Sequence, residues 1–127
     1  MGGRIVEIEL QEIRQFISVV PPFDLLSENE LKQIVQRLGI RYLRRGKFLP
    51  PDSKSPPSLY FIRQGTVSLY STDNELIGML AEGELCTAFC DTDVDAMIHA
   101  TATEDTLVYG IPCVELFDII SSKPLVK

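Results

Sequence analysis

The stretch Leu59-Tyr-Phe-Ile-Arg-Gln-Gly65-Thr-Val-Ser-Leu-Tyr70 decides the fold class of this chain. Its second half alternates polar and apolar side chains with the period of two that is typical of a half-buried strand. The pair Gln64-Gly65 separates two strand-like runs and is short enough for a hairpin turn. The stretch therefore predicts two strands, over 59–63 and 66–70, joined by a tight turn.

Further short runs on both sides of this stretch have the same character. They are separated by Arg45-Gly46 and Asp73-Asn74, both of which are typical turn sequences. We predict strands over 40–43, 47–49, 75–80 and 106–111. Segment 50–57 holds four prolines, which exclude regular strand pairing there. Many short strands without interleaved helices indicate a sandwich or jelly roll rather than a doubly wound sheet.

Helical patterns flank this β region on both sides. Ser27 and Glu30 have the spacing of a capping box at the start of a helix over 28–38, for which Gly39 is the expected left-handed stop. A short helix is predicted to begin at Pro112, because proline suits the first helical turn. An earlier amphipathic helix ends at Pro21-Pro22, and its apolar face comprises Leu10, Ile13, Phe16, Ile17 and Val20.

The predicted fold class is therefore α+β and mainly β: an antiparallel jelly roll or β-roll flanked by N-terminal helices and a short C-terminal helix. The 127 residues suit a single domain. We divide it into a helical lead-in over 5–39, a β-roll over 40–111 and a C-terminal helix over 112–121.

Composition excludes several classes of function. The net charge of -6 argues against non-specific nucleic-acid binding, which needs basic side chains to replace phosphate counterions. A local basic cluster at Arg41, Arg44, Arg45 and Lys47 is better explained as a solvated strand edge. No apolar run approaches the roughly 20 residues of a membrane span, and the N-terminus lacks a signal peptide pattern. Three cysteines fit a reducing compartment, so we expect a cytoplasmic protein without nucleic-acid or membrane partners.

Five short motifs follow one another along the chain. They are Pro22-Phe23-x-x-Leu26-x-x-x-x-Leu31, Arg44-Arg-Gly46-Lys-Phe-Leu49, the stretch Leu59 to Tyr70, Glu82-Gly83-Glu84, and Ala102-Thr-Glu-Asp105-Thr-Leu-Val-Tyr109. In this order they resemble the motifs of cyclic nucleotide-binding domains. The resemblance spans about Pro21 to Ile120 and implies the β-roll of that family and a non-enzymatic role in signal transduction. The opening helix and the Pro-Pro-Phe-Asp-Leu-Leu lead-in are most similar to a bacterial branch in which this domain precedes paired CBS domains and a nucleotidyltransferase-like module.

In that family the phosphate-binding segment reads roughly F-G-E-[LM]-A, followed by R-x-A-T. Glycine lets the backbone approach the phosphate, glutamate binds the ribose hydroxyl and arginine neutralises the cyclic phosphate. If Gly83-Glu84-Leu85 is the turn before this segment, then Thr87, Ala88 and Ala96 take the glycine, glutamate and arginine positions. The other alignment uses Gly83-Glu84 as the G-E pair, and it also finds no Lys or Arg between residues 85 and 102.

Three carboxylates, Asp91, Asp93 and Asp95, stand in this stretch instead. Two unit charges ~4 Å apart interact by about 4 kcal/mol at an effective dielectric near 20, and a micromolar ligand has only about 8 kcal/mol in total. We therefore predict that ordinary cAMP or cGMP binding is lost or very weak, and that no cofactor is needed. The residues expected to line this degenerate pocket are Gly83, Glu84, Leu85, Thr87, Ala88, Ala96 and His99.

The same stretch also has residue types that occur in metal sites and in nucleophilic catalysis. Cys86, Cys90 and His99 have ligand types that zinc prefers, and the three aspartates imitate the opening of a calcium loop. That loop would need glycine at position 96 and glutamate at position 102, where alanines stand. Thiols buried as small hydrophobic groups and a solvated acidic loop explain the stretch better. No orienting group accompanies a cysteine–histidine pair, so we expect no metal and no catalytic residue.

The expected function is a regulatory module that holds or transmits a conformational state to C-terminal domains beyond Lys127. The long lid helix of the resembled family is missing after residue 121, which indicates a piece of a longer chain. One alternative is a sensor of a different small ligand or nucleotide. Another is a protein–protein or homodimerisation scaffold, with contact faces on the first helix (Ile13, Phe16, Ile17) and the last helix (Phe117, Ile120).

Overall fold

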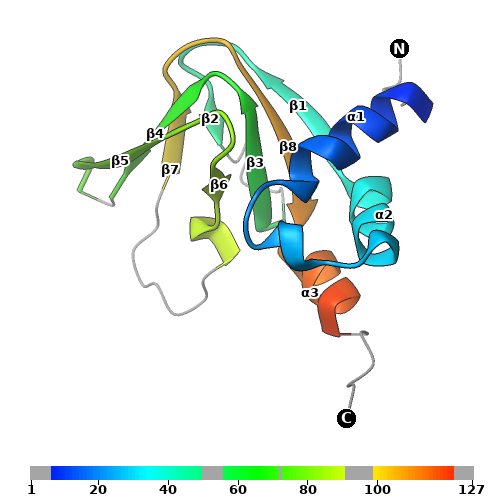
Figure 1. Cartoon of the computed structure of the whole chain (residues 1–127). Coiled ribbons are helices and arrows are strands. Elements are labelled where there is room, and N and C mark those ends of the chain that lie inside the picture. The colour runs from blue at the N-terminus through cyan, green and yellow to red at the C-terminus, as the bar shows by residue number, and fades with distance from the viewer. Residues whose placement is uncertain (1–6, 50–55, 72, 91–98, 122–127) are drawn as a thin grey trace.

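The chain folds into two antiparallel sheets with helices on one side, as the computed structural model shows for residues 7–49, 56–71, 73–90 and 99–121 (Figure 1). The helix-covered sheet has the order β1-β8-β3-β6, and the open sheet has the order β2-β7-β4-β5. This confirms the mainly β roll with flanking helices. The first sheet comprises β1 (Gly39–Leu43), β8 (Thr106–Pro112), β3 (Ser58–Gln64) and β6 (Leu85–Cys86); the second comprises β2 (Phe48–Leu49), β7 (His99–Ala102), β4 (Thr66–Tyr70) and β5 (Leu76–Ala81).

Every strand predicted from the sequence occurs, with bounds that differ by one residue at most. The sequence did not reveal β6 and β7, because two-residue β6 is too short for a periodic pattern and β7 begins next to the acidic stretch. The predicted acidic loop at Asp91–Asp95 and the loop at Pro50–Ser55 fall outside the described residues.

The tight turn at Gln64-Gly65 does not make the predicted hairpin. β3 pairs with β6 and β8, whereas β4 pairs with β5 and β7, so the chain passes from one sheet to the other at Gly65. Gly65 has a φ of 96°, and a Cβ there would lie 2.5 Å from the Thr106 hydroxyl. The corner packs against the β7–β8 turn, and this packing takes the place of strand pairing between β3 and β4.

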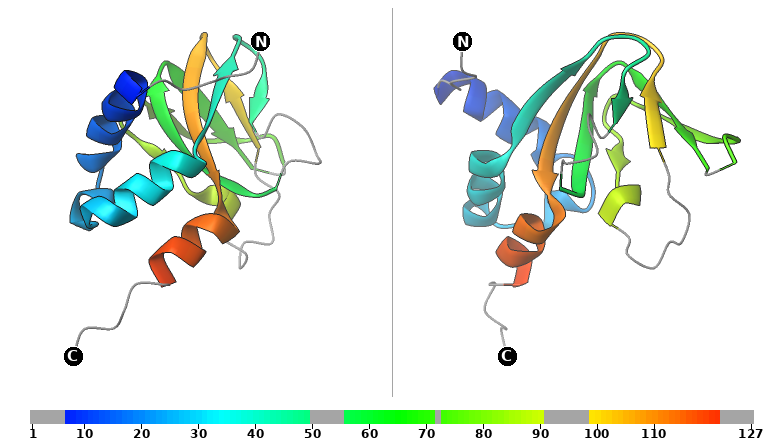
Figure 2. Two further views of the ribbon diagram at one scale, coloured as in Figure 1. Left: turned by 90° about the vertical axis from the view of Figure 1, so that its right-hand side faces the viewer. Right: turned by 180° about the vertical axis from the view of Figure 1, so that it is seen from behind.

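Three α-helices and one 3-10 turn lie on the outer side of the first sheet, the last of them below the C-terminal end of β8 (Figure 2). They are α1 (Glu7–Ser18), the 3-10 turn η1 (Phe23–Leu25), α2 (Glu28–Arg37) and α3 (Cys113–Ser121). Because side chains alternate along β3, Phe61 is buried against the helices while Tyr60 and Ile62 are buried between the sheets. No helix in the described part of the chain is long and apolar enough to cross a membrane.

The capping box of α2 is confirmed. The Ser27 hydroxyl accepts the Glu30 N–H at 3.1 Å, and the Glu30 carboxylate accepts the Ser27 N–H at 2.9 Å. The expected left-handed stop at Gly39 is wrong, because Leu38 already turns to an extended conformation and Gly39 opens β1. The basic cluster does lie exposed, on edge strand β1 and in the turn that follows it.

The contact face proposed for the first helix is also wrong. Ile13 and Ile17 are buried in the core between the helices and the first sheet, with exposed fractions of 3% and 0%. Phe16 packs edge-on against Tyr109 with ring centroids 5.9 Å apart. This apolar face holds the domain together and is not available to a second molecule.

Candidate functional site

Two of the predicted pocket residues, Gly83 and Glu84, form the turn before β6. Gly83 has a φ of 89° and donates its N–H to the carbonyl of Ile62 at 2.8 Å. The Glu84 carboxylate accepts the N–H of Ala81 at 2.7 Å, and the Glu84 N–H bonds back to the Ala81 carbonyl. Both residues therefore close the β5–β6 turn, and the Glu84 side chain is engaged with the backbone.

The chain then pairs briefly with β3 and enters the 3-10 turn η2 (Ala88–Cys90). Leu85 pairs with Phe61 and Cys86 with Tyr60. Thr87 is exposed, and its carbonyl accepts the N–H of Cys90 at 3.0 Å. The backbone of Ala88 opens η2. Leu85, Thr87 and Ala88 thus follow one another at the edge of the helix-covered sheet, close behind the Gly83-Glu84 turn.

Phe89 and Cys86 connect η2 to the interior of the roll. The Phe89 ring lies edge-on to Tyr60, with centroids 6.0 Å apart. Cys86 is 1% exposed and packs between the two sheets. Ala96, which takes the arginine position in the sequence comparison, lies outside the described residues, as do Asp91, Asp93 and Asp95.

His99 stands apart from the other candidates, on the outer face of the open sheet. Its ring stacks on Tyr70 with centroids 5.3 Å apart and meets Phe48, which is 59% exposed, edge-on at 6.0 Å. Its strand neighbours Ala100 and Ala102 point into the core between the sheets. Alternation along β7 therefore directs His99 away from the roll interior.

The three residues weighed as zinc ligands do not meet. Cys86 lies inside the roll and His99 on its outside, while the sulfur of Cys90 is bonded to Cys113. In the described segments no three His, Cys, Asp or Glu side chains gather as a metal site would require.

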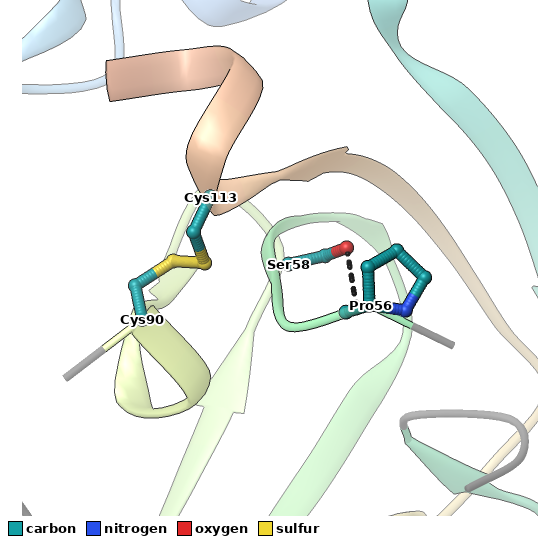
Figure 3. Close-up of a disulfide and its surroundings, with 4 residues drawn as sticks. All are labelled: Pro56, Ser58, Cys90 and Cys113. Carbon is teal, nitrogen blue, oxygen red and sulfur yellow. Dashed lines mark hydrogen bonds between the residues drawn. A yellow bond between two sulfur atoms is a disulfide. The ribbon is translucent and has the colours of Figure 1, made fainter. Parts of the chain in front are cut away.

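The disulfide between Cys90 and Cys113 was not foreseen, and the expectation of free thiols is wrong for these two residues. It joins the end of η2 to the first residue of α3, with Cα atoms 5.6 Å apart (Figure 3). The register of β3 explains the meeting, because β6 and β8 flank β3 and both run antiparallel to it. Their C-terminal ends thus lie at the same end of β3, near Ser58.

Sequence alone offers no signal for this pairing. Three cysteines allow three single disulfides, and spacing does not choose between them. Backbone and side-chain hydrogen bonds further organise the junction: Cys113 donates its N–H to the Pro57 carbonyl at 2.9 Å, and the Ser58 hydroxyl donates to the Pro56 carbonyl at 3.1 Å.

Arg63, the arginine nearest in sequence to the predicted phosphate-binding segment, points toward the helices. Arg63 follows Phe61 on the helix side of β3, and its guanidinium lies 4.8 Å from the Phe16 ring centroid. It also contacts the Glu82 carboxylate at 3.4 Å. Arg63 is therefore not directed at the space between the sheets.

Comparison with known proteins gives structural matches alone: no family model and no curated protein matches the sequence. The cAMP-bound PfPKA-R has a TM-score of 0.73 at 21% identity, over 91% of this chain and 43% of that chain. The sensor domain of the transcriptional regulator DNR from Pseudomonas aeruginosa has a TM-score of 0.77 at 14% identity, over 88% and 79%.

A third structure is the regulatory subunit of a cAMP-independent protein kinase A from Trypanosoma cruzi, bound to guanosine. It has a TM-score of 0.69 at 18% identity, over 89% of this chain and 44% of that chain. The chain thus spans less than half the length of the two kinase regulatory chains. At these identities the likeness establishes architecture: this chain has the fold of cyclic nucleotide-binding domains.

Proposed function

We propose that this chain is a non-enzymatic regulatory module that uses the cyclic nucleotide-binding fold without its cyclic phosphate chemistry. One observation carries the proposal: the chain between β6 and β7 holds no Lys or Arg and three aspartates. A cyclic phosphate placed there would meet carboxylates where the resembled family supplies a guanidinium.

Arg63, the arginine nearest to this segment in sequence, is not a substitute cation. Arg63 faces the helices and contacts Glu82, and Glu84 is bonded to the Ala81 N–H. A single repulsive contact at ~4 Å is worth about 4 kcal/mol at an effective dielectric near 20, half of what a micromolar ligand has. Electrostatics therefore favours a ligand without a phosphate.

An uncharged nucleoside is the ligand class that fits this requirement. The structurally similar Trypanosoma cruzi subunit is described as cAMP-independent and bound to guanosine, so this fold can hold a nucleoside that carries no phosphate. We propose a neutral nucleoside, or another neutral small molecule of that size, as the regulatory ligand. Its effect would pass through α3 to C-terminal domains, such as the CBS domains of the bacterial branch that the sequence resembles.

Isothermal titration with cAMP, cGMP, guanosine and adenosine tests the proposal. We expect no heat of binding for the two cyclic nucleotides and a saturable isotherm for a nucleoside. A thermal-shift series with the same four compounds provides a second readout, because a ligand that prefers the folded state raises the unfolding midpoint. A low-micromolar dissociation constant for cAMP or cGMP would contradict the proposal.

A second candidate function is self-association through α3. Val114, Phe117 and Ile120 lie at three-residue steps on this helix and are 73%, 50% and 41% exposed. Side chains at this spacing share one helix face, and an uncharged apolar face is self-complementary in a two-fold dimer. We propose a second copy of this chain as its partner.

Light scattering distinguishes this candidate from a purely monomeric sensor. Phe117→Asp is expected to convert a dimer to a monomer. Ile77→Asp on β5 is the matched control, because Ile77 is similarly exposed at 54% but lies on the open sheet, away from α3 (Figure 1). A monomeric wild-type chain would overturn this second candidate.

A further inference from the structure

The Cys90–Cys113 disulfide is the one covalent link between η2 and α3 in the described chain, and it lies at the junction that the proposed function depends on. We propose that it is a reversible thiol–disulfide site, opened by a dithiol reductant, that fastens the end of η2 to the start of α3. The proposal concerns the opening and closing of this disulfide. Any influence of the disulfide on ligand binding rests on the proposed function.

The two sides of the link are held very differently without it. α3 buries Leu116 and Ile119 in the core under the helices, with exposed fractions of 4% and 2%, and is also fixed through the Cys113 N–H. In contrast, η2 has three residues and one backbone hydrogen bond, from Cys90 to Thr87. Its Phe89 and Cys90 side chains pack against the core but are only half-buried. Breaking the disulfide should therefore release η2 while α3 stays docked.

Access to the two sulfur atoms also differs. Cys113 is 5% exposed, whereas Cys90 is half-buried at the surface end of the link. A thiolate of the reductant attacks the Cys90 sulfur, forms a mixed disulfide and expels the Cys113 thiolate, which takes up a proton. The second thiol of the reductant then attacks the sulfur by which the reductant is bonded to Cys90, and it releases Cys90 as a thiol. Two electrons and two protons reach the protein, and the reductant leaves as a disulfide.

The number and place of the cysteines favour a regulatory bond over a purely structural one. A chain with three cysteines is not a disulfide-dense scaffold. In the reducing compartment that the sequence analysis expects for this chain, an isolated disulfide is usually transient or redox-sensing. This bond joins the end of η2 to the first residue of α3. Its redox state would thus set how firmly η2 is tied to α3.

Hydrogen exchange on the chain in its oxidised and dithiothreitol-reduced forms tests whether the disulfide restrains η2. We expect amide exchange in 87–90 to rise about tenfold or more on reduction, and exchange in 116–121 to change much less. The Cys90→Ser/Cys113→Ser double variant should show the exchange rates of the reduced protein, and dithiothreitol should not change them. Cys86→Ala is the matched control, because it removes a buried thiol but keeps the Cys90–Cys113 disulfide, so reduction should still raise the exchange in 87–90.

Three outcomes would overturn the proposal. One is an unchanged exchange rate in 87–90 on reduction. Another is alkylation of both cysteines in protein that has been equilibrated with oxidised glutathione. The third is a disulfide that stays closed in excess reduced glutathione with thioredoxin, since the bond would then be structural. A guanosine titration in both redox states distinguishes the two proposals. If guanosine does not bind, the proposed nucleoside ligand is refuted, whereas the exchange data still decide whether the disulfide restrains η2.

Discussion

Cys90 and Cys113 lie with Cα atoms 5.6 Å apart because two strands that flank β3 end at the same point. One strand leads into η2 and the other into α3, so the sheet register brings together two segments that are 23 residues apart in sequence. The junction connects η2 to α3. Loss of either cysteine should therefore act mainly on η2, because α3 stays docked through its buried Leu116 and Ile119.

Loss of the disulfide is expected to lower the free energy of unfolding by about 2–4 kcal/mol, because a cross-link of this span restricts the unfolded chain. Cys113→Ser should show this loss in urea unfolding followed by circular dichroism. Wild-type protein in reductant should unfold at the same midpoint as the variant, within error. Equal stability of the oxidised wild type and the variant would contradict the prediction.

Gly65 is expected to be the least replaceable glycine among the described residues. Its φ of 96° disfavours any side chain, and a Cβ would lie 2.5 Å from the Thr106 hydroxyl and 2.8 Å from the Asp105 carbonyl. Gly65→Ala should cost about 3 kcal/mol or more, combining backbone strain with overlap.

Gly46→Ala is the matched control for this substitution. Gly46 has a similar φ of 90°, but no atom lies within 4 Å of the added Cβ. Strain alone should cost about 1 kcal/mol there. Denaturant melts of both variants measure the difference, and equal losses would show that the corner between the sheets tolerates a side chain.

Local signals predicted most of the secondary structure, because each depends on residues close in sequence. The capping box of Ser27 and Glu30 spans four residues, and the alternation of β4 spans five. The hairpin at Gln64-Gly65 failed for the opposite reason. Whether two successive strands pair or separate into different sheets depends on Thr106 and on β8, which are about 40 residues away.

The candidate site was less predictable, because its members are brought together by register and alternation. The sequence comparison put His99 and Thr87 in the lining of one pocket, yet strand alternation along β7 turns His99 to the outside. Conversely, nothing in the spacing of Cys90 and Cys113 indicates that β6 and β8 share β3 as a neighbour. The lack of basic residues in this stretch needed no structure, since it is a property of the sequence itself.

Asp105 provides a pH-dependent contact at the β7–β8 turn. The Arg45 backbone N–H donates to its carboxylate at 3.0 Å and lowers the pKa of Asp105 below its ordinary value, and a hydrogen bond from Tyr42 acts in the same direction. The same bond to Asp105 raises the pKa of Tyr42. A lowered folded-state pKa means stability that is present above the unfolded-state pKa of Asp105.

This stability should be lost as the pH falls through the folded-state pKa of Asp105. Asp105→Asn is expected to flatten the acid limb of a plot of melting temperature against pH, whereas Tyr42→Phe should reduce its slope only in part. NMR titration of the Asp105 carboxyl carbon measures the pKa directly. A value at or above that of an unstructured aspartate would contradict the assigned hydrogen bonds.

Restoring the missing phosphate chemistry is the most demanding test of the proposed function. The triple variant Thr87→Gly/Ala88→Glu/Ala96→Arg supplies the glycine, glutamate and arginine of the resembled family at the aligned positions. A hydrogen bond to a charged group contributes about 1.5–3 kcal/mol, so the arginine alone should improve cAMP affinity by roughly 10- to 100-fold. Isothermal titration should then detect cAMP binding that weakens as salt is added, because the gain is electrostatic.

The Ala96→Gln version of the same triple variant separates charge from shape. Glutamine offers hydrogen bonds without a positive charge, so it should recover little cAMP affinity and show little dependence on salt. If the arginine and glutamine versions bind cAMP equally well, charge at position 96 is not what the chain lacks. If neither binds, while circular dichroism shows that both are folded, the aspartates of the same stretch are the remaining obstacle. Adding Asp95→Asn to the arginine version should then raise the affinity, because it removes a carboxylate adjacent in sequence to the new guanidinium.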